Sequence, residues 1–160
     1  MRVDTGLQRE IKRLEMWRKG SICLTSSARL EWQGIAIERH VAEPGEVPNT
    51  STSHIIVELA SGRRSSHGER PVARGRFIPY TKRPGSLNVY AEGVLPLLYP
   101  STRTELIVCA LDRATVAKIA AEQDGPVEEA PREVIGLRDD GVAGLITLLE
   151  QEARLVACNN

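Results

Sequence analysis

Between residues 21 and 111 the chain consists of short apolar runs interrupted by Gly, Pro, Ser and Asn, with no helical pattern between them. Turn-forming pairs such as Pro44-Gly45 and Pro84-Gly85 separate the runs. Strands joined only by turns favour an antiparallel sandwich or barrel over alternating strand–helix units. The predicted strands span residues 22–25, 35–41, 54–59, 72–78, 87–90 and 105–111, with weaker candidates at 63–66 and 94–98.

Helical periodicity returns at the two ends of the chain. A short apolar stripe within residues 1–20 predicts an N-terminal helix or arm, and residues 112–160 are predicted to form a helical segment behind the barrel of residues 21–111. We expect Asp112 to cap the first of these helices with its side chain. Residues 125–136 are rich in Glu and Pro and indicate an exposed connection.

A final helix is predicted over residues 141–157. Its apolar positions form one broad stripe near a heptad seam, made of Val142, Leu145, Ile146, Leu149, Ala153 and Val156. An apolar stripe of this size needs a surface that covers it. Packing onto the chain's own sheet and pairing with a second copy in a homodimer are both open, because amphipathic helices serve both purposes.

Composition excludes several classes of protein. Lys and Arg number 21 and so do Asp and Glu, so the formal net charge is zero, which disfavours a protein that coats nucleic acid or an anionic membrane. Basic residues gather between positions 63 and 83, where we expect a solvated surface. No apolar run approaches the ~20 residues that span a bilayer, and the three widely spaced cysteines indicate free thiols. We therefore expect a soluble, cytoplasmic protein with no membrane partner.

The order of strands and turns also matches a known pattern. It runs from a strand and Pro-Gly turn in residues 32–48, through residues 54–62 and 75–90, to residues 105–112, where a strand opens a helix. This pattern resembles the N-terminal sensor domain of AraC-type bacterial transcriptional regulators. The resemblance implies a cupin-like antiparallel β-barrel, or jelly roll, whose following helices help to form a dimer. It also implies that a separate helix-turn-helix segment reads DNA, so we expect no direct DNA binding by this chain alone.

The cupin comparison allows a test for a metal site. Metal-binding cupins share a ligand pattern of two His residues followed by one Glu and, on a later strand, another His. His54 and Glu58 match the second half of the first motif in this pattern. Thr52 stands at the partner position of the first motif, and Asn88 stands where the later His is sought. Because a transition metal needs convergent imidazole and carboxylate ligands, we expect no metal and no cofactor here.

Strand alternation selects the candidate binding residues. Glu38 and His40 share one face of their strand, as do Asn88 and Tyr90. Glu38 and His40 are expected to form a solvated pair, because charged strand residues usually face water. The alternative is that such residues line a ligand pocket inside the barrel. The candidates for that pocket are His54, Glu58, Asn88, Tyr90, Glu38 and His40.

Three functional hypotheses follow. The first is an effector-sensing, dimerising domain of an AraC-type regulator that binds an unidentified small molecule and is not catalytic, in which the ligand shifts the population of dimer states. The second is a small cupin-like isomerase or dioxygenase, which would need a metal or an acid–base pair. The third is an interaction domain whose barrel is filled by side chains. The sequence contains no motif for nucleophilic catalysis or phosphate binding, and we assign no catalytic residue.

Overall fold

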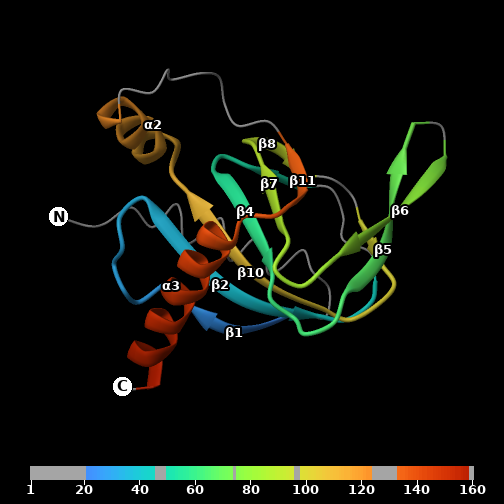
Figure 1. Cartoon of the computed structure of the whole chain (residues 1–160), viewed down its shortest axis with the longest axis horizontal. Coiled ribbons are helices and arrows are strands. Elements are labelled where there is room, and N and C mark those ends of the chain that lie inside the picture. Colours follow the sequence, from blue (N-terminus) through green and yellow to red (C-terminus); the bar gives the residue numbers. More distant parts are fainter. Residues whose placement is uncertain (1–20, 46–49, 74, 96–97, 124–132, 159–160) are drawn as a thin grey trace.

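A computed structural model describes residues 21–45, 50–73, 75–95, 98–123 and 133–158 of the chain. Within these residues one large and two small antiparallel sheets face each other, with two helices on the outside (Figure 1). The predicted N-terminal segment, residues 1–20, lies outside the described residues.

The large sheet has six strands in the order β1-β2-β10-β4-β7-β11. Apart from β1 and β2, strands that pair in this sheet come from distant parts of the chain, as in a jelly roll. A three-stranded sheet, β6-β5-β9, and a two-stranded sheet, β3-β8, complete the β structure. The bounds of the large-sheet strands are β1 Ile22–Ser26, β2 Ile35–Ala42, β10 Thr104–Leu111, β4 Ile55–Ala60, β7 Leu87–Tyr90 and β11 Val134–Leu137. Those of the small sheets are β6 Arg76–Lys82, β5 Ser66–Val72, β9 Tyr99–Pro100, β3 Thr50–Thr52 and β8 Gly93–Leu95. The predicted fold class, mainly β with antiparallel jelly-roll sheets and C-terminal helices, is confirmed.

Both faces of the large sheet are covered, and every residue of its strand β4 is buried. The outer face packs against helix α3, Asp140–Cys158, and its buried cluster comprises Ile37, Val57, Leu59, Leu87, Ile107 and Cys109 with Ile146 and Ala153 of the helix. The inner face carries a second cluster of Ala36, Ile56, Tyr90, Leu106, Val108 and Ala110. Burial of each large apolar side chain contributes roughly 1.5–3 kcal/mol, so these two layers hold the fold together.

Helix α3 lies across β1, β2 and β10 of its own sheet (Figure 1). The predicted single stripe is divided, because Ile146 and Ala153 are buried under the helix whereas Leu145 is 63% exposed and Val142 is 39% exposed. Packing on the chain's own sheet is thus the observed role of the buried part. The homodimer stays a prediction, now for the exposed part of the helix.

Several local expectations are wrong. The predicted strand over residues 72–78 is instead a hairpin in which Val72 pairs with Arg76, because Gly75 adopts a φ of 68° and turns the chain. The connection predicted over residues 125–136 ends in strand β11, which pairs with β7. Residues 63–65 are not a strand, since β5 begins at Ser66.

Helix α2, Arg113–Glu122, also departs from its expected cap. Asp112 occupies the N-cap position, but its side chain makes no capping hydrogen bond to the backbone. Instead its carboxylate accepts a 3.3 Å hydrogen bond from the Thr115 hydroxyl. No residue of this helix is fully buried, and Thr115, Val116, Ala117 and Ala120 are partly buried.

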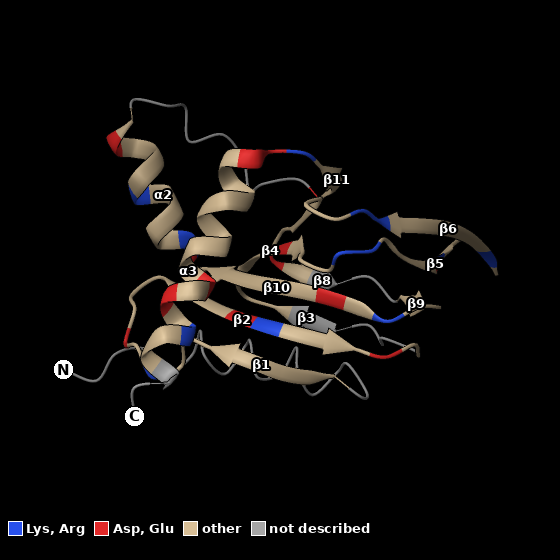
Figure 2. Cartoon of the chain, turned by 60° about the horizontal axis from the view of Figure 1, so that its bottom comes forward, with Lys and Arg blue, Asp and Glu red and all other residues tan. Residues whose placement is uncertain are grey.

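Charges of both signs are interspersed along the strands and helices (Figure 2). None of the helices that the structure describes is long and apolar enough to cross a membrane.

Candidate functional site

Cross-strand register places the polar candidates on the inner face of the large sheet. Glu38 lies opposite Val108, Val108 opposite Glu58, and Glu58 opposite Asn88. Residues directly opposite each other share a face, so these side chains point away from α3 and toward the smaller sheets. His40 and Tyr90 belong to the same face by strand alternation. All five polar residues, Glu38, His40, Glu58, Asn88 and Tyr90, are at most 5% exposed.

A buried ion pair joins the two sides of the barrel. The Lys82 ammonium, from β6, donates a 2.8 Å hydrogen bond to Glu58 Oε2 of β4, and both side chains are 7% exposed. The hydroxyl of Tyr90 donates to the same oxygen at 3.4 Å. Buried charges persist only when they are paired and hydrogen-bonded, so this contact is a strong constraint on where β6 sits. The expectation of a solvated basic surface is wrong for Lys82.

A cavity of about 310 Å³ opens beside this network. Its polar wall includes Lys82, Asn88 and Tyr90, and Arg70 of β5 joins them. Its apolar wall includes Ile78, Leu98 and Ile135. A small cavity with an apolar wall and a few converging polar groups is the usual form of a small-molecule site.

Asn88 connects the cavity to strand β11. Its side-chain amide donates to the Tyr90 hydroxyl at 3.3 Å, and its carbonyl accepts a 3.0 Å hydrogen bond from the backbone N–H of Gly136. The β11–β7 pairing is irregular between Val134 and Leu137. The side chain of Asn88 therefore replaces regular ladder hydrogen bonds in holding β11 to the sheet.

Glu38 and His40 form a second buried network at the other side of the inner face. His40 Nε2 lies 2.9 Å from Glu38 Oε2, and each residue is 1% exposed. The Ser26 hydroxyl donates to Glu38 Oε1 at 2.8 Å, and Ser21 Oγ lies 3.1 Å from His40 Nδ1. The predicted solvated pair is thus wrong, because the inner face of β2 is covered and the two residues satisfy each other.

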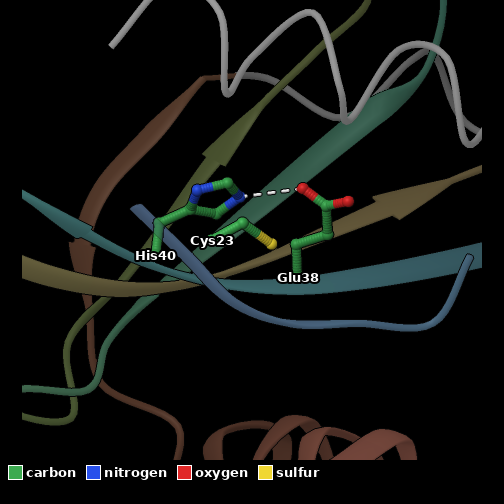
Figure 3. Close-up of side chains that lie close together, drawn as sticks. All are labelled: Cys23, Glu38 and His40. Atoms are coloured by element: carbon green, nitrogen blue, oxygen red, sulfur yellow. Dashed lines mark hydrogen bonds and ion pairs between the residues drawn. The ribbon is translucent and has the colours of Figure 1, made fainter. Parts of the chain in front are cut away.

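A β-bulge in β1 adds a third side chain to this network. Cys23 pairs with His40 and Ser26 pairs with Glu38, and the irregularity between Cys23 and Thr25 makes Leu24 the extra residue. Without it, residues three apart would point to opposite faces. The ligand atoms of Cys23, Glu38 and His40 all lie within 4.8 Å of one another (Figure 3). Cys109 faces the other way, and burial raises the pKa of its thiol to about 12.

His54 does not join Glu58. It precedes β4, is 9% exposed, and its Nδ1 lies 3.2 Å from the Ser53 hydroxyl. The Glu58 carboxylate is instead bound to the Lys82 ammonium, a cation that would repel a metal ion. With Thr52 and Asn88 at the other two positions, the residues at the usual cupin metal position do not fit a metal.

Sequence reasoning missed Lys82, Ser26 and Cys23. Lys82 lies in a basic stretch that is typical of a solvated surface, and its partner is 24 residues away in sequence. Because of the bulge, simple strand alternation assigns Cys23 and Ser26 to opposite faces. No local sequence signal marks the bulge. Strand alternation is the signal that could have identified Lys82, because it places Lys82 on the same inward face as Ile78 and Tyr80.

Comparisons with known proteins find solved structures with a similar fold but no relatives by sequence. A scan against known protein families and a search of curated proteins both find no match. Among solved structures, the EutQ protein of Clostridium difficile is 9% identical, with a TM-score of 0.41, over 57% of this chain and 66% of that one. A cupin domain from Bordetella pertussis is 14% identical, with a TM-score of 0.43, over 58% and 94%. An oxalate decarboxylase variant from Bacillus subtilis is 13% identical, with a TM-score of 0.42, over 74% and 37%. The functional argument therefore rests on this chain's own residues.

Proposed function

We propose that the chain is a sensor domain that binds a small organic molecule in the cavity between β7, β11 and the β5–β6 hairpin. The observation that carries this proposal is the cavity of about 310 Å³, which combines an apolar wall with buried polar groups. Its volume is at the lower end of ligand pockets, which favours a small metabolite over a large cofactor.

The charges around the cavity favour a ligand with a carboxylate or similar acceptor. Lys82 is neutralised by Glu58 at 2.8 Å, whereas Arg70 and Glu133 are 3.8 Å apart and partly exposed. A ligand carboxylate can replace Glu133 on the Arg70 guanidinium and form charge-assisted hydrogen bonds. The apolar remainder of the ligand would lie against Ile78, Leu98 and Ile135.

The route from the cavity to the outside runs through β11. Ile135 and Gly136 line the cavity, and Asp139, two residues after β11, accepts a 2.9 Å hydrogen bond from the Val142 N–H at the start of α3. A ligand that binds one position of β11 better than another would therefore also shift the position of α3. Three leucines of this helix, Leu145, Leu148 and Leu155, are at least 62% exposed. We propose that they form the homodimer surface that senses this shift.

This linkage supports the finer proposal that the chain is the sensor of an AraC-type transcriptional regulator in the cytoplasm. The role is binding and not catalysis, because the polar groups of the cavity are engaged with one another as structural partners. An enzymatic role is the alternative, and turnover of any compound that binds would favour it.

The test is a thermal-shift screen of carboxylic acids, amides and alcohols, followed by calorimetry on the compounds that bind. We expect carboxylates to bind, and Arg70→Gln to weaken their affinity by about 10-fold or more, since hydrogen bonds to charged groups contribute about 1.5–3 kcal/mol. Arg103→Gln is the matched control, because Arg103 is exposed and pairs with Glu43 away from the cavity. Equal affinity in the wild type and Arg70→Gln, or no binding by any compound, would overturn the proposal.

The dimer is tested separately by light scattering. Leu145→Glu with Leu148→Glu places charges on the exposed part of α3, and we expect it to convert a dimer to a monomer without loss of folding. Ile146 is not suitable for this test, because it is buried against the chain's own sheet. A wild-type protein that is monomeric at all concentrations contradicts the dimer.

A further inference from the structure

We propose that Cys23, Glu38 and His40 form a binding site for one Zn²⁺ ion, with a water or another external group as the fourth ligand. The three offer one sulfur, one carboxylate oxygen and one imidazole nitrogen within 4.8 Å of one another (Figure 3). This set is distinct from the His54 and Glu58 positions, where a metal does not fit. It is also distinct from the proposed ligand cavity, because Glu38 lies two strands, or about 10 Å, from Glu58.

The distances suit a tetrahedral ion after small side-chain rotations. Zinc binds nitrogen and oxygen at about 2.0–2.2 Å and sulfur at about 2.3 Å, so neighbouring ligands in a tetrahedron are about 3.3–3.7 Å apart. His40 Nε2 and Glu38 Oε2, now 2.9 Å apart, would separate by about half an ångström. No ligand atom is more than 4.8 Å from the others, so closure by about 1 Å completes the site.

Outer hydrogen bonds already orient two of the ligands. A ligating histidine normally uses its second nitrogen for a hydrogen bond, and His40 Nδ1 lies 3.1 Å from Ser21 Oγ. Ligating carboxylates are also hydrogen-bonded, and Glu38 Oε1 accepts from the Ser26 hydroxyl at 2.8 Å. These contacts leave His40 Nε2 and Glu38 Oε2 directed at each other. The ion would lie between these two atoms.

The donor types select the metal. A thiolate with an imidazole favours zinc over magnesium or calcium, which prefer oxygen ligands. Two anionic ligands, Cys23 and Glu38, would balance the charge of a divalent ion, so the bound site adds no net charge to the barrel interior. Among the described strands β1 lies at the edge of the large sheet, and Cys23 on it is only partly buried, so the site lies near that edge.

Zinc and cobalt titrations of the chelator-treated full chain test the proposal. We expect one Zn²⁺ per chain by calorimetry, and a sulfur-to-metal charge-transfer band with tetrahedral d–d absorption when Co²⁺ replaces it. Cys23→Ser should remove the charge-transfer band and lower Zn²⁺ affinity about 100-fold or more, since loss of even an outer partner costs 10–100-fold. Ser21→Ala should lower affinity about 10-fold while the band remains.

Matched controls use the same residue types elsewhere in the chain. Cys109→Ala removes a thiol on the outer face of the sheet, and His67→Gln removes an exposed imidazole, so both should bind Zn²⁺ as the wild type does. Circular dichroism of each metal-free variant checks that it is folded. The proposal is wrong if the wild type binds no zinc, or if Cys23→Ser binds it with unchanged affinity. Neither result bears on Arg70 or on carboxylate binding, so the two sites are tested independently.

Discussion

The buried Glu58–Lys82 pair gives the sharpest prediction of stability. Lys82→Met keeps the apolar stem of the side chain but removes the ammonium, so the buried Glu58 carboxylate loses its 2.8 Å ion pair. At 2.8 Å and an effective dielectric constant of 20, the lost Coulomb attraction is roughly 6 kcal/mol. The net loss of stability is smaller, because the ammonium no longer has to be desolvated when the chain folds. Loss of one member of a buried pair typically costs about 3–5 kcal/mol.

Urea unfolding followed by circular dichroism measures this cost, together with a thermal melt. For a chain of this length we expect Tm to fall by about 6–20 °C. Combining Lys82→Met with Glu58→Gln removes both charges of the pair. The double variant should therefore lose about 1–3 kcal/mol less stability than the two single losses added together. Arg103→Met is the control, because its pair with Glu43 is 3.9 Å long and about 60% exposed. It should cost less than about 1 kcal/mol, and an equal loss in Lys82→Met would refute the reasoning.

Three further changes test the rest of the fold. Burial raises the pKa of the Cys109 thiol from 9.0 to about 12, so the unfolded chain loses this proton first and the free energy of unfolding should fall between pH 9 and 12, by at most about 4 kcal/mol. Urea titrations should show the fall in the wild type and a smaller one in Cys109→Ala. Gly68→Ala places a Cβ 2.7 Å from a β9 carbonyl and should cost about 1–3 kcal/mol in the same assay, whereas Gly144→Ala, with open space around it, should stabilise α3 by up to about 1 kcal/mol; the same sign in both variants contradicts this. Ile146→Ala should lower the unfolding free energy by about 2–5 kcal/mol and Leu145→Ala by much less, and equal losses would show that the helix packs differently.

The fold was predictable because turn residues mark most strand ends. Pro84-Gly85 before Leu87 and Pro44-Gly45 after β2 place those strands within a residue or two of their observed bounds. The hairpin at 72–76 was not predictable from apolar content, because β5 is largely polar and both strands are partly exposed. Exposed strands carry little hydrophobic pattern, so their pairing depends on the turn alone.

The sequence predicts which candidate residues share a face of their own strand, but not which residues they contact on other strands. Alternation places Glu38 with His40, and Asn88 with Tyr90, but only cross-strand register brings Glu58 to the same surface. Burial could not be derived, since a charged strand residue faces water unless another sheet covers it. That cover comes from strands distant in sequence, and its effect on each side chain depends on how the three sheets pack together.

The extra residue in β1 lets this five-residue strand make contacts on both faces of the sheet. On one side Thr25 donates to the buried Glu150 of α3 at 2.9 Å, and on the other Cys23 and Ser26 reach Glu38 and His40. Loss of Leu24 would reverse the direction of every side chain before it and turn Cys23 away from Glu38 and His40, while Thr25 and Ser26 would keep their contacts. The number of residues in this strand is therefore constrained more tightly than the identity of Leu24, whose exposed side chain many other residues can replace.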